Sequence, residues 1–159
     1  QKINEICLKN KLSERKTVDV SIVVRTYNEA HHINKLLKGI EAQSVRPREI
    51  IGVDSGSTDE TVVRAKAWGS SIVNIDKNKF TFGRALNIGC AAAEGEILLF
   101  VSGHVYPTNE TWLEQMLEPF GNPKTVLTYG GQIGGITNKF SEHQIFAHWF
   151  PSSTDTEKK

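Results

Sequence analysis

The sequence predicts an α/β fold, with a mainly parallel, twisted sheet and helices on both of its faces. Short apolar stretches rich in β-branched residues alternate four times with helix-like stretches, at the spacing of βαβ units. The apolar stretches are nearly continuous, which is typical of parallel strands buried on both faces. A length of 159 residues fits one domain with a sizeable core.

The first half of the expected domain begins after a mostly polar segment. Residues 1–17 are predicted to be an N-terminal extension or linker, and the first strand is expected over 18–25. An amphipathic helix should follow, because apolar residues recur there at helical spacing. These residues are Ile33, Leu36, Leu37 and Ile40. The second strand should end at Asp54, and Ser57 with Glu60 three residues later forms a capping-box pattern that predicts a helix start at Ser57.

The second half repeats the alternation and then loses it. We expect strands over 71–75, 97–101 and 125–129, with helices over 84–94 and about 112–120 between them. The pattern fades after Gly135. The predicted domain therefore covers 18–150, and residues 151–159 are predicted to be a flexible tail.

Composition excludes some classes of partner. A net charge of +1 without a long basic block gives no case for nucleic acid binding. No apolar run approaches the roughly 20 residues of a membrane helix, and the N-terminus has no signal-peptide pattern. We therefore expect a cytoplasmic protein.

Three polar loops are expected at the same edge of the sheet, over 26–29, 54–59 and 102–106, because parallel strands end together and ligands bind there. The Asp54 carboxylate suits a donor such as a nucleobase N–H or a ribose hydroxyl, although the same turn would also serve only to cap its helix. Neither common glycine-rich phosphate motif is present. A divalent metal is one alternative counter-charge for a diphosphate.

Four blocks of the sequence resemble family 2 glycosyltransferases, which have the Rossmann-like GT-A fold. They are Ser21-Ile22-Val23-Val24-Arg25-Thr26-Tyr27-Asn28-Glu29, Val53-Asp54-Ser55-Gly56-Ser57-Thr58-Asp59, Phe82-Gly83-Arg84-Ala85-Leu86-Asn87-Ile88-Gly89 and Gly95-Glu96-Ile97-Leu98-Leu99-Phe100-Val101. All four occur in the family's order and spacing, over residues 18 to about 135.

The resemblance implies a nucleotide-sugar site. The first loop would hold base and ribose, Asp54 would accept a hydrogen bond from the base, usually uracil, and the helix start at Arg84 would face the diphosphate and sugar. The implied nucleotide-binding residues are Thr26, Tyr27, Asn28, Glu29, Asp54, Ser55, Ser57, Arg84, Asn87, Ser102 and Gly103.

The sequence departs from the family at Ser102-Gly103-His104, where the family commonly has Asp-x-Asp. Ser102 could still bond to ribose. His104 is expected to ligate the metal through neutral imidazole, which shifts preference from Mg²⁺ towards Mn²⁺.

The expected function is transfer of a sugar from a nucleoside-diphosphate donor, UDP-sugar first, to a glycan or lipid-linked acceptor, with inversion. No carboxylate after Gly135 matches the family's catalytic base, so we expect the donor-binding half of a larger enzyme, associated peripherally with the cytoplasmic face of a membrane through its remaining parts. One alternative is a non-catalytic nucleotide-binding module with a degenerate metal site. A nucleotidyltransferase, the third function considered, is less favoured than these two.

Overall fold

The computed structural model describes residues 15–135 and 139–150. Two compact units are distinguished, Gln1–Gln115 and Met116–Lys159, and each is described here by itself. The predictions for residues 1–14 and for the tail at 151–159 lie outside the described residues. The expected domain limits stay predictions.

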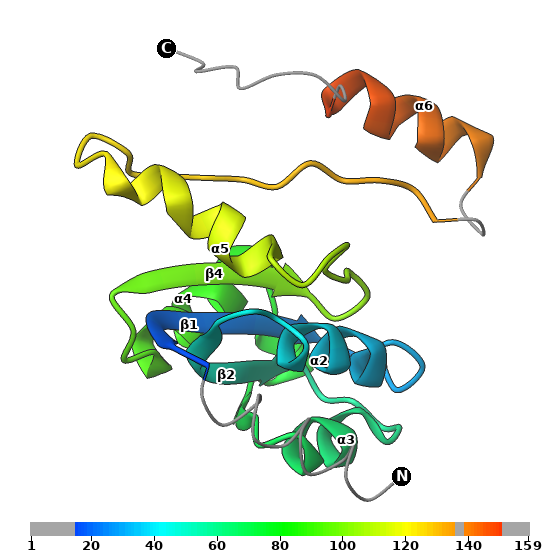
Figure 1. Ribbon diagram of the computed structural model, residues 1–159. Coiled ribbons are helices and arrows are strands. Elements are labelled where there is room, and N and C mark those ends of the chain that lie inside the picture. Colours follow the sequence, from blue (N-terminus) through cyan, green and yellow to red (C-terminus); the bar gives the residue numbers. More distant parts are fainter. Residues whose placement is uncertain (1–14, 136–138, 151–159) are drawn as a thin grey trace, which may run out of the picture. The chain divides into compact units, whose positions relative to one another are not determined.

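The first unit contains a four-stranded parallel sheet with strand order β3-β2-β1-β4 (Figure 1). The strands are β1 (Thr17–Thr26), β2 (Arg46–Asp54), β3 (Ser71–Asn74) and β4 (Ile97–Ser102). This confirms the predicted α/β class. In the register, Thr26 lies opposite Asp54, which lies opposite Asn74, and Arg25 lies opposite Ser102. The strands therefore all end at one edge of the sheet, which we call the carboxyl edge.

Three helices connect the strands in chain order, α2 (Ile33–Glu41), α3 (Thr61–Ala67) and α4 (Phe82–Ala92), with a short 3₁₀ turn η1 (Lys77–Lys79) before α4. A further helix, α5 (Trp112–Leu117), follows β4. The four apolar residues expected on one face of α2 are all buried, which confirms its amphipathic pattern. Of the helices in the described ranges, none is long and apolar enough to cross a membrane.

Strand β1 lies at the centre of the core. No side chain from Val20 to Val24 is more than 1% exposed, so both faces of the strand are covered. Helix α4 packs closely on one face, where a Cβ on Gly89 would lie only 2.3 Å from Cγ1 of Val23. A glycine at this position thus allows the backbone of α4 to approach the sheet.

A buried glutamine fixes the segment that follows β4. Gln43 is 1% exposed, and its side-chain amide donates to the carbonyl oxygens of Gly39 and Asn109 over 3.0 and 2.8 Å. Its Oε1 accepts from the backbone N–H of Leu113 over 2.9 Å. Every buried polar atom of this side chain is therefore satisfied, and the start of α5 is held against the end of α2.

Helix α3 begins at Thr61, so the predicted start at Ser57 is wrong. The reason is local competition for hydrogen bonds. The Ser57 hydroxyl and backbone N–H both donate to the Asp54 carboxylate, so they stabilise the turn and not the helix. Asp59 instead accepts from the N–H of Thr61 over 2.9 Å.

In the second unit, the strand predicted over 125–129 is absent. Residues 125–130 have no regular secondary structure, and the side chains of Val126, Leu127 and Tyr129 are 89%, 77% and 62% exposed. A strand needs a neighbouring strand to satisfy its backbone, and among the described residues this apolar segment has none. The unit also contains η2 (Glu118–Gly121) and a helix that was not predicted, α6 (Phe140–Trp149).

A polar cluster joins β1 and β2 to the segment before β4, near the opposite, amino edge of the sheet. The Ser21 hydroxyl donates to Oε1 of Glu49 over 2.6 Å and accepts from the N–H of Gly95 over 2.8 Å, and the same Oε1 accepts from the N–H of Glu94 over 2.7 Å. A Cβ on Gly95 would lie 2.6 Å from the backbone nitrogen of Ser21. Only glycine therefore allows this approach.

Gly95→Ala should destabilise the protein by about 1–3 kcal/mol, because the added methyl group forces the backbone of β1 and β4 apart. Gly83→Ala is the control, since a Cβ there meets nothing within 4 Å and alanine favours the α4 helix. Urea unfolding of both variants measures the difference. Equal stabilities would contradict the close approach at Gly95.

The same cluster predicts an acid dependence of stability. The Ser21 hydroxyl, followed by the N–H of Glu94, lowers the pKa of Glu49 below its ordinary value of 4.5. A lowered folded-state pKa stabilises the protein above the unfolded-state pKa, and this stabilisation is lost as pH falls through the folded-state pKa. The stability advantage of the native chain over Glu49→Gln should therefore shrink as pH is lowered from about 6 to about 3 in urea titrations. A difference independent of pH would contradict this role of the carboxylate.

Candidate functional site

The Asp54 carboxylate organises the turn that follows β2. It is 2% exposed, and its two oxygens accept from four donors. Oδ2 accepts from the backbone N–H groups of Gly56 and Ser57 over 3.0 and 2.8 Å, and Oδ1 accepts from the hydroxyls of Thr26 and Ser57. Gly56 has φ +90°, a conformation that side chains rarely adopt. The carboxylate thus fixes the backbone of the loop around it.

The loop after β1 (27–32, the first loop) is bonded to the loop after β2 (55–60, the second loop). The N–H of Asn28 donates to the Ser57 hydroxyl over 2.9 Å, and its side-chain oxygen accepts from the N–H of Thr58 over 2.8 Å. Asn28 has φ 54°, the left-handed region that asparagine tolerates better than most residues. The hydroxyl and N–H of Ser55 also donate to the carbonyl oxygen of Thr26.

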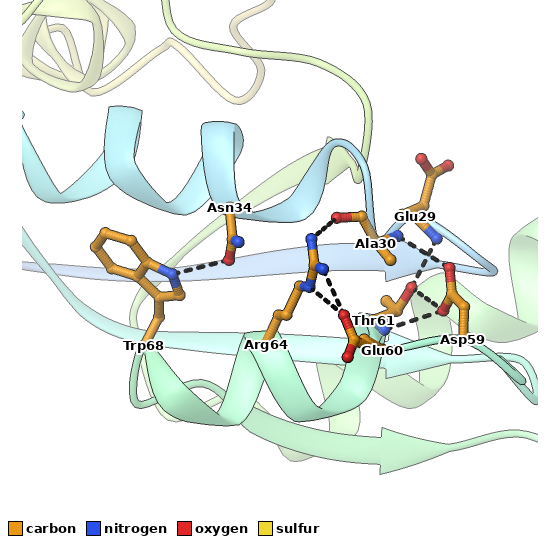
Figure 2. A network of polar contacts seen from close by, with 8 residues as sticks. All are labelled: Glu29, Ala30, Asn34, Asp59, Glu60, Thr61, Arg64 and Trp68. Atoms are coloured by element: carbon orange, nitrogen blue, oxygen red, sulfur yellow. Dashed lines mark hydrogen bonds and ion pairs between the residues drawn. The ribbon is translucent and has the colours of Figure 1, made fainter.

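Figure 2 shows how the same two loops are fixed further along. Asp59 accepts from the N–H of Ala30 over 3.0 Å, and the Thr61 hydroxyl accepts from the N–H of Glu29 over 2.7 Å. Arg64 donates to the carbonyl oxygen of Ala30 over 2.7 Å and pairs with Glu60. The backbone of Glu29 is thereby held, while its side chain points away from this group of contacts.

The Glu29 side chain instead reaches the loop after β4 (103–111, the third loop). Its Oε1 lies 2.8 Å from Nδ1 of His104. The carboxylate is 16% exposed and the imidazole 59% exposed. Gly103 makes this contact possible, because a Cβ there would lie 2.9 Å from Cγ of Glu29. With Nδ1–H donated to the carboxylate, the His104 tautomer carries its lone pair on Nε2, to which no described residue bonds.

The guanidinium of Arg25 lies beside Ser102-Gly103-His104, which we call the triplet. Arg25 donates from Nη2 to the Ser102 hydroxyl over 3.1 Å, and its Cζ lies 4.8 Å from the centre of the Phe82 ring, at the start of α4. The carbonyl oxygen of Arg25 accepts from the N–H of Gly103 over 3.1 Å. Arg25 thus joins β1 to the third loop and to the amino end of α4.

Aromatic and basic side chains border the three loops. Lys77 donates from Nζ to the Tyr27 hydroxyl over 2.7 Å. On the other side, the Tyr106 hydroxyl bonds to Nδ1 of His32, and Lys35 lies 4.1 Å from the centre of the Tyr106 ring. Burial, and then the nearby charge of Glu29, raise the pKa of the Tyr106 phenol, which therefore stays neutral.

The structure brings together nine of the eleven residues expected at the nucleotide, together with His104. Arg84 and Asn87 are exposed on α4, and no described contact joins either to the loops after β1, β2 or β4. Sequence reasoning missed Arg25 and Lys77 as members of the site. A charge at the end of an otherwise buried apolar strand was the available signal for Arg25, because arginine is rarely buried without a partner.

Among the described residues, no group of three or more histidine, cysteine or acidic side chains could hold a metal ion. The protein groups available near the triplet are one imidazole nitrogen, Nε2 of His104, and the Glu29 carboxylate behind it. An imidazole hydrogen-bonded to a carboxylate is a common metal ligand, but it fills only one coordination position. These residues therefore fit a metal only if a bound ligand, such as a diphosphate, supplies most of the coordination.

A separate hollow of about 320 Å³ lies near the amino end of β2. Leu37 and Ile40 of α2, Pro47, and Trp68 after α3 line it. Its lining residues include none of those at the carboxyl edge, so it is distinct from the three-loop site.

The sequence matches a family described as glycosyl transferase family 2 over residues 21–158. A similar curated protein is the O-antigen chain rhamnosyltransferase RfbN of Salmonella typhimurium, which is 27% identical over 116 residues, covering 72% of this chain and 37% of that protein. The chain thus spans little more than a third of this relative's length.

Solved structures agree with this match. S. aureus TarS 1-349 has a TM-score of 0.56 and 27% identity, over 63% of this chain and 32% of that one. Glucosyl-3-phosphoglycerate synthase from Mycobacterium tuberculosis, solved with Mn²⁺, UDP and glucosyl-3-phosphoglycerate, has a TM-score of 0.55 and 26% identity, over 71% and 42% of the two chains. The match over residues 21–158 shows that the chain belongs to glycosyl transferase family 2, and its parallel sheet and these neighbours show that it has the GT-A fold.

Proposed function

We propose that this chain forms the donor-binding part of a glycosyltransferase that takes a nucleoside-diphosphate sugar, UDP-sugar first, and transfers its sugar to a glycan or lipid-linked acceptor with inversion. One observation carries the proposal. Three loops at the carboxyl edge are joined by hydrogen bonds, and they present an imidazole and several basic side chains next to the buried Asp54 turn. The M. tuberculosis neighbour, whose structure contains UDP and Mn²⁺, supports the choice of nucleotide.

The first and second loops would hold the nucleoside. Thr26, Asn28, Ser55 and Ser57 fix the walls of this part of the site, and Tyr27 is 41% exposed beside them. The four bonds to Asp54 occupy the acceptor positions of its carboxylate. A base N–H that bonds to Asp54 would therefore displace one of the two hydroxyl donors, Thr26 or Ser57. Ser57 is the more accessible of the two, because it is half-exposed.

The third loop would face the diphosphate. Glu29 holds His104 so that Nε2 is free to bind a metal, with Mn²⁺ preferred over Mg²⁺, while Ser102 and Gly103 line the loop. A metal bound there would offset the negative charge that builds on the departing nucleoside diphosphate. Arg84 and Asn87 on α4 are proposed to approach the donor from the opposite side.

A second candidate function is nucleotide binding without catalysis. Ser102 stands where the family commonly has an acid, and the described residues offer no group of three metal ligands. This alternative predicts nucleotide binding that does not depend on metal.

Calorimetric titration of UDP separates the two functions. With Mn²⁺ present we expect binding that falls at least about tenfold when EDTA replaces the metal, and that falls by a similar factor in His104→Ala. His148→Ala is the matched control, because His148 is exposed on α6 and belongs to none of the three loops. Equal affinity in Mn²⁺, in EDTA and in His104→Ala would favour the non-catalytic module. Absence of UDP binding by the native chain would contradict both functions.

A further inference from the structure

Arg25 occupies a place in the fold where a positive charge needs an explanation. It is the penultimate residue of β1, and the five residues before it are buried. The side chain is itself partly buried, and Ser102 fixes it from one side while the Phe82 ring lies under its guanidinium. A guanidinium held in this way has lost most of its rotamer freedom before any ligand binds.

No carboxylate neutralises this cation within the described ranges. The ion pairs there involve Arg48, Arg64 and His104. Asp54 at the end of β2 and Glu29 in the first loop are committed elsewhere, because four donors occupy Asp54 and His104 bonds to Glu29. A partly buried charge without a counter-charge is unfavourable, so the arrangement suits an anionic ligand.

The surroundings favour an anion with two phosphates. Arg25 lies between the third loop and the amino end of α4, where the helix dipole is positive. Lys77 stands on the loop between β3 and α4, and Arg84 on the first turn of α4. A single bond to Ser102 leaves most of the five guanidinium N–H donors for phosphate oxygens, which match their planar geometry.

We propose that Arg25 binds the diphosphate of the nucleotide-sugar donor, with Ser102 as the residue that positions it. This inference rests on the proposed function. It also explains why a hydroxyl at position 102 suits this site. A neutral serine orients the guanidinium and leaves its charge available, whereas an aspartate would neutralise it in an ion pair.

The test compares UDP with uridine, which lacks the phosphates, in NMR titrations of the native chain, Arg25→Gln and Arg25→Lys, all in EDTA. Arg25→Gln should lose about tenfold or more in UDP affinity and keep its uridine affinity, because only the charged bonds to phosphate are removed. Arg25→Lys should fall between the two, since it keeps the charge but not the planar fork.

Arg48→Gln is the matched control. It removes the same charge from β2, where Arg48 pairs with Asp19 and Glu94, and it should leave UDP affinity unchanged. Ser102→Asp gives a second, opposite test. In EDTA it should weaken UDP binding several-fold, because the new carboxylate competes with phosphate for Arg25.

The possible failures are distinguishable. If Arg25→Gln and Arg25→Lys bind UDP with the affinity of the native chain, Arg25 does not bind the diphosphate and the inference is wrong. The same conclusion follows if their affinity for uridine falls by the same factor as their affinity for UDP. If Ser102→Asp strengthens UDP binding in EDTA, the positioning role of Ser102 is wrong. If the native chain binds neither ligand in EDTA and binds no UDP in the calorimetry with Mn²⁺, the proposed function fails, and this inference fails with it.

Discussion

The burial of the Asp54 carboxylate is the constraint on which the carboxyl edge depends. A carboxylate that is only 2% exposed needs hydrogen-bond donors around it. Thr26 at the end of β1 and the turn that follows Asp54 supply them. To do so, Thr26 must lie opposite Asp54, and Ser57 must turn back towards it. The first and second loops can then bond to each other, which holds the backbone of Glu29 and directs its side chain to His104.

Acidic and basic groups have different tasks in this arrangement. Asp54 and Asp59 accept hydrogen bonds within the loops, and Glu29 orients an imidazole, so the acids shape the site. The basic groups Arg25 and Lys77 carry no described ion pair and lie beside aromatic rings. A site with this distribution of charge favours an anionic ligand, and the proposed nucleoside diphosphate has that charge.

Periodicity and strand composition were enough to predict the parallel sheet, the buried face of α2 and the common edge for Asp54 and the triplet at 102–104. They could not predict which donors each side chain selects. Ser57 fits a helix cap by spacing, but the buried Asp54 offers it a stronger acceptor, so the helix begins later. The segment 125–129 has strand-like residues without a neighbouring strand. Arg25 was missed because its hydrogen-bond partner, Ser102, lies 77 residues away in the sequence.

The most direct test of the account is an NMR map of where UDP binds. Backbone amide signals of the native chain, recorded during a UDP titration with Mg²⁺ as the diamagnetic metal, report each residue separately. We expect the largest shifts at the carboxyl edge, at Asn28, Ser57 and Gly103 of the three loops. Shifts confined to the hollow near Trp68, at the amino end of β2, would contradict the assignment of the three loops as the donor site.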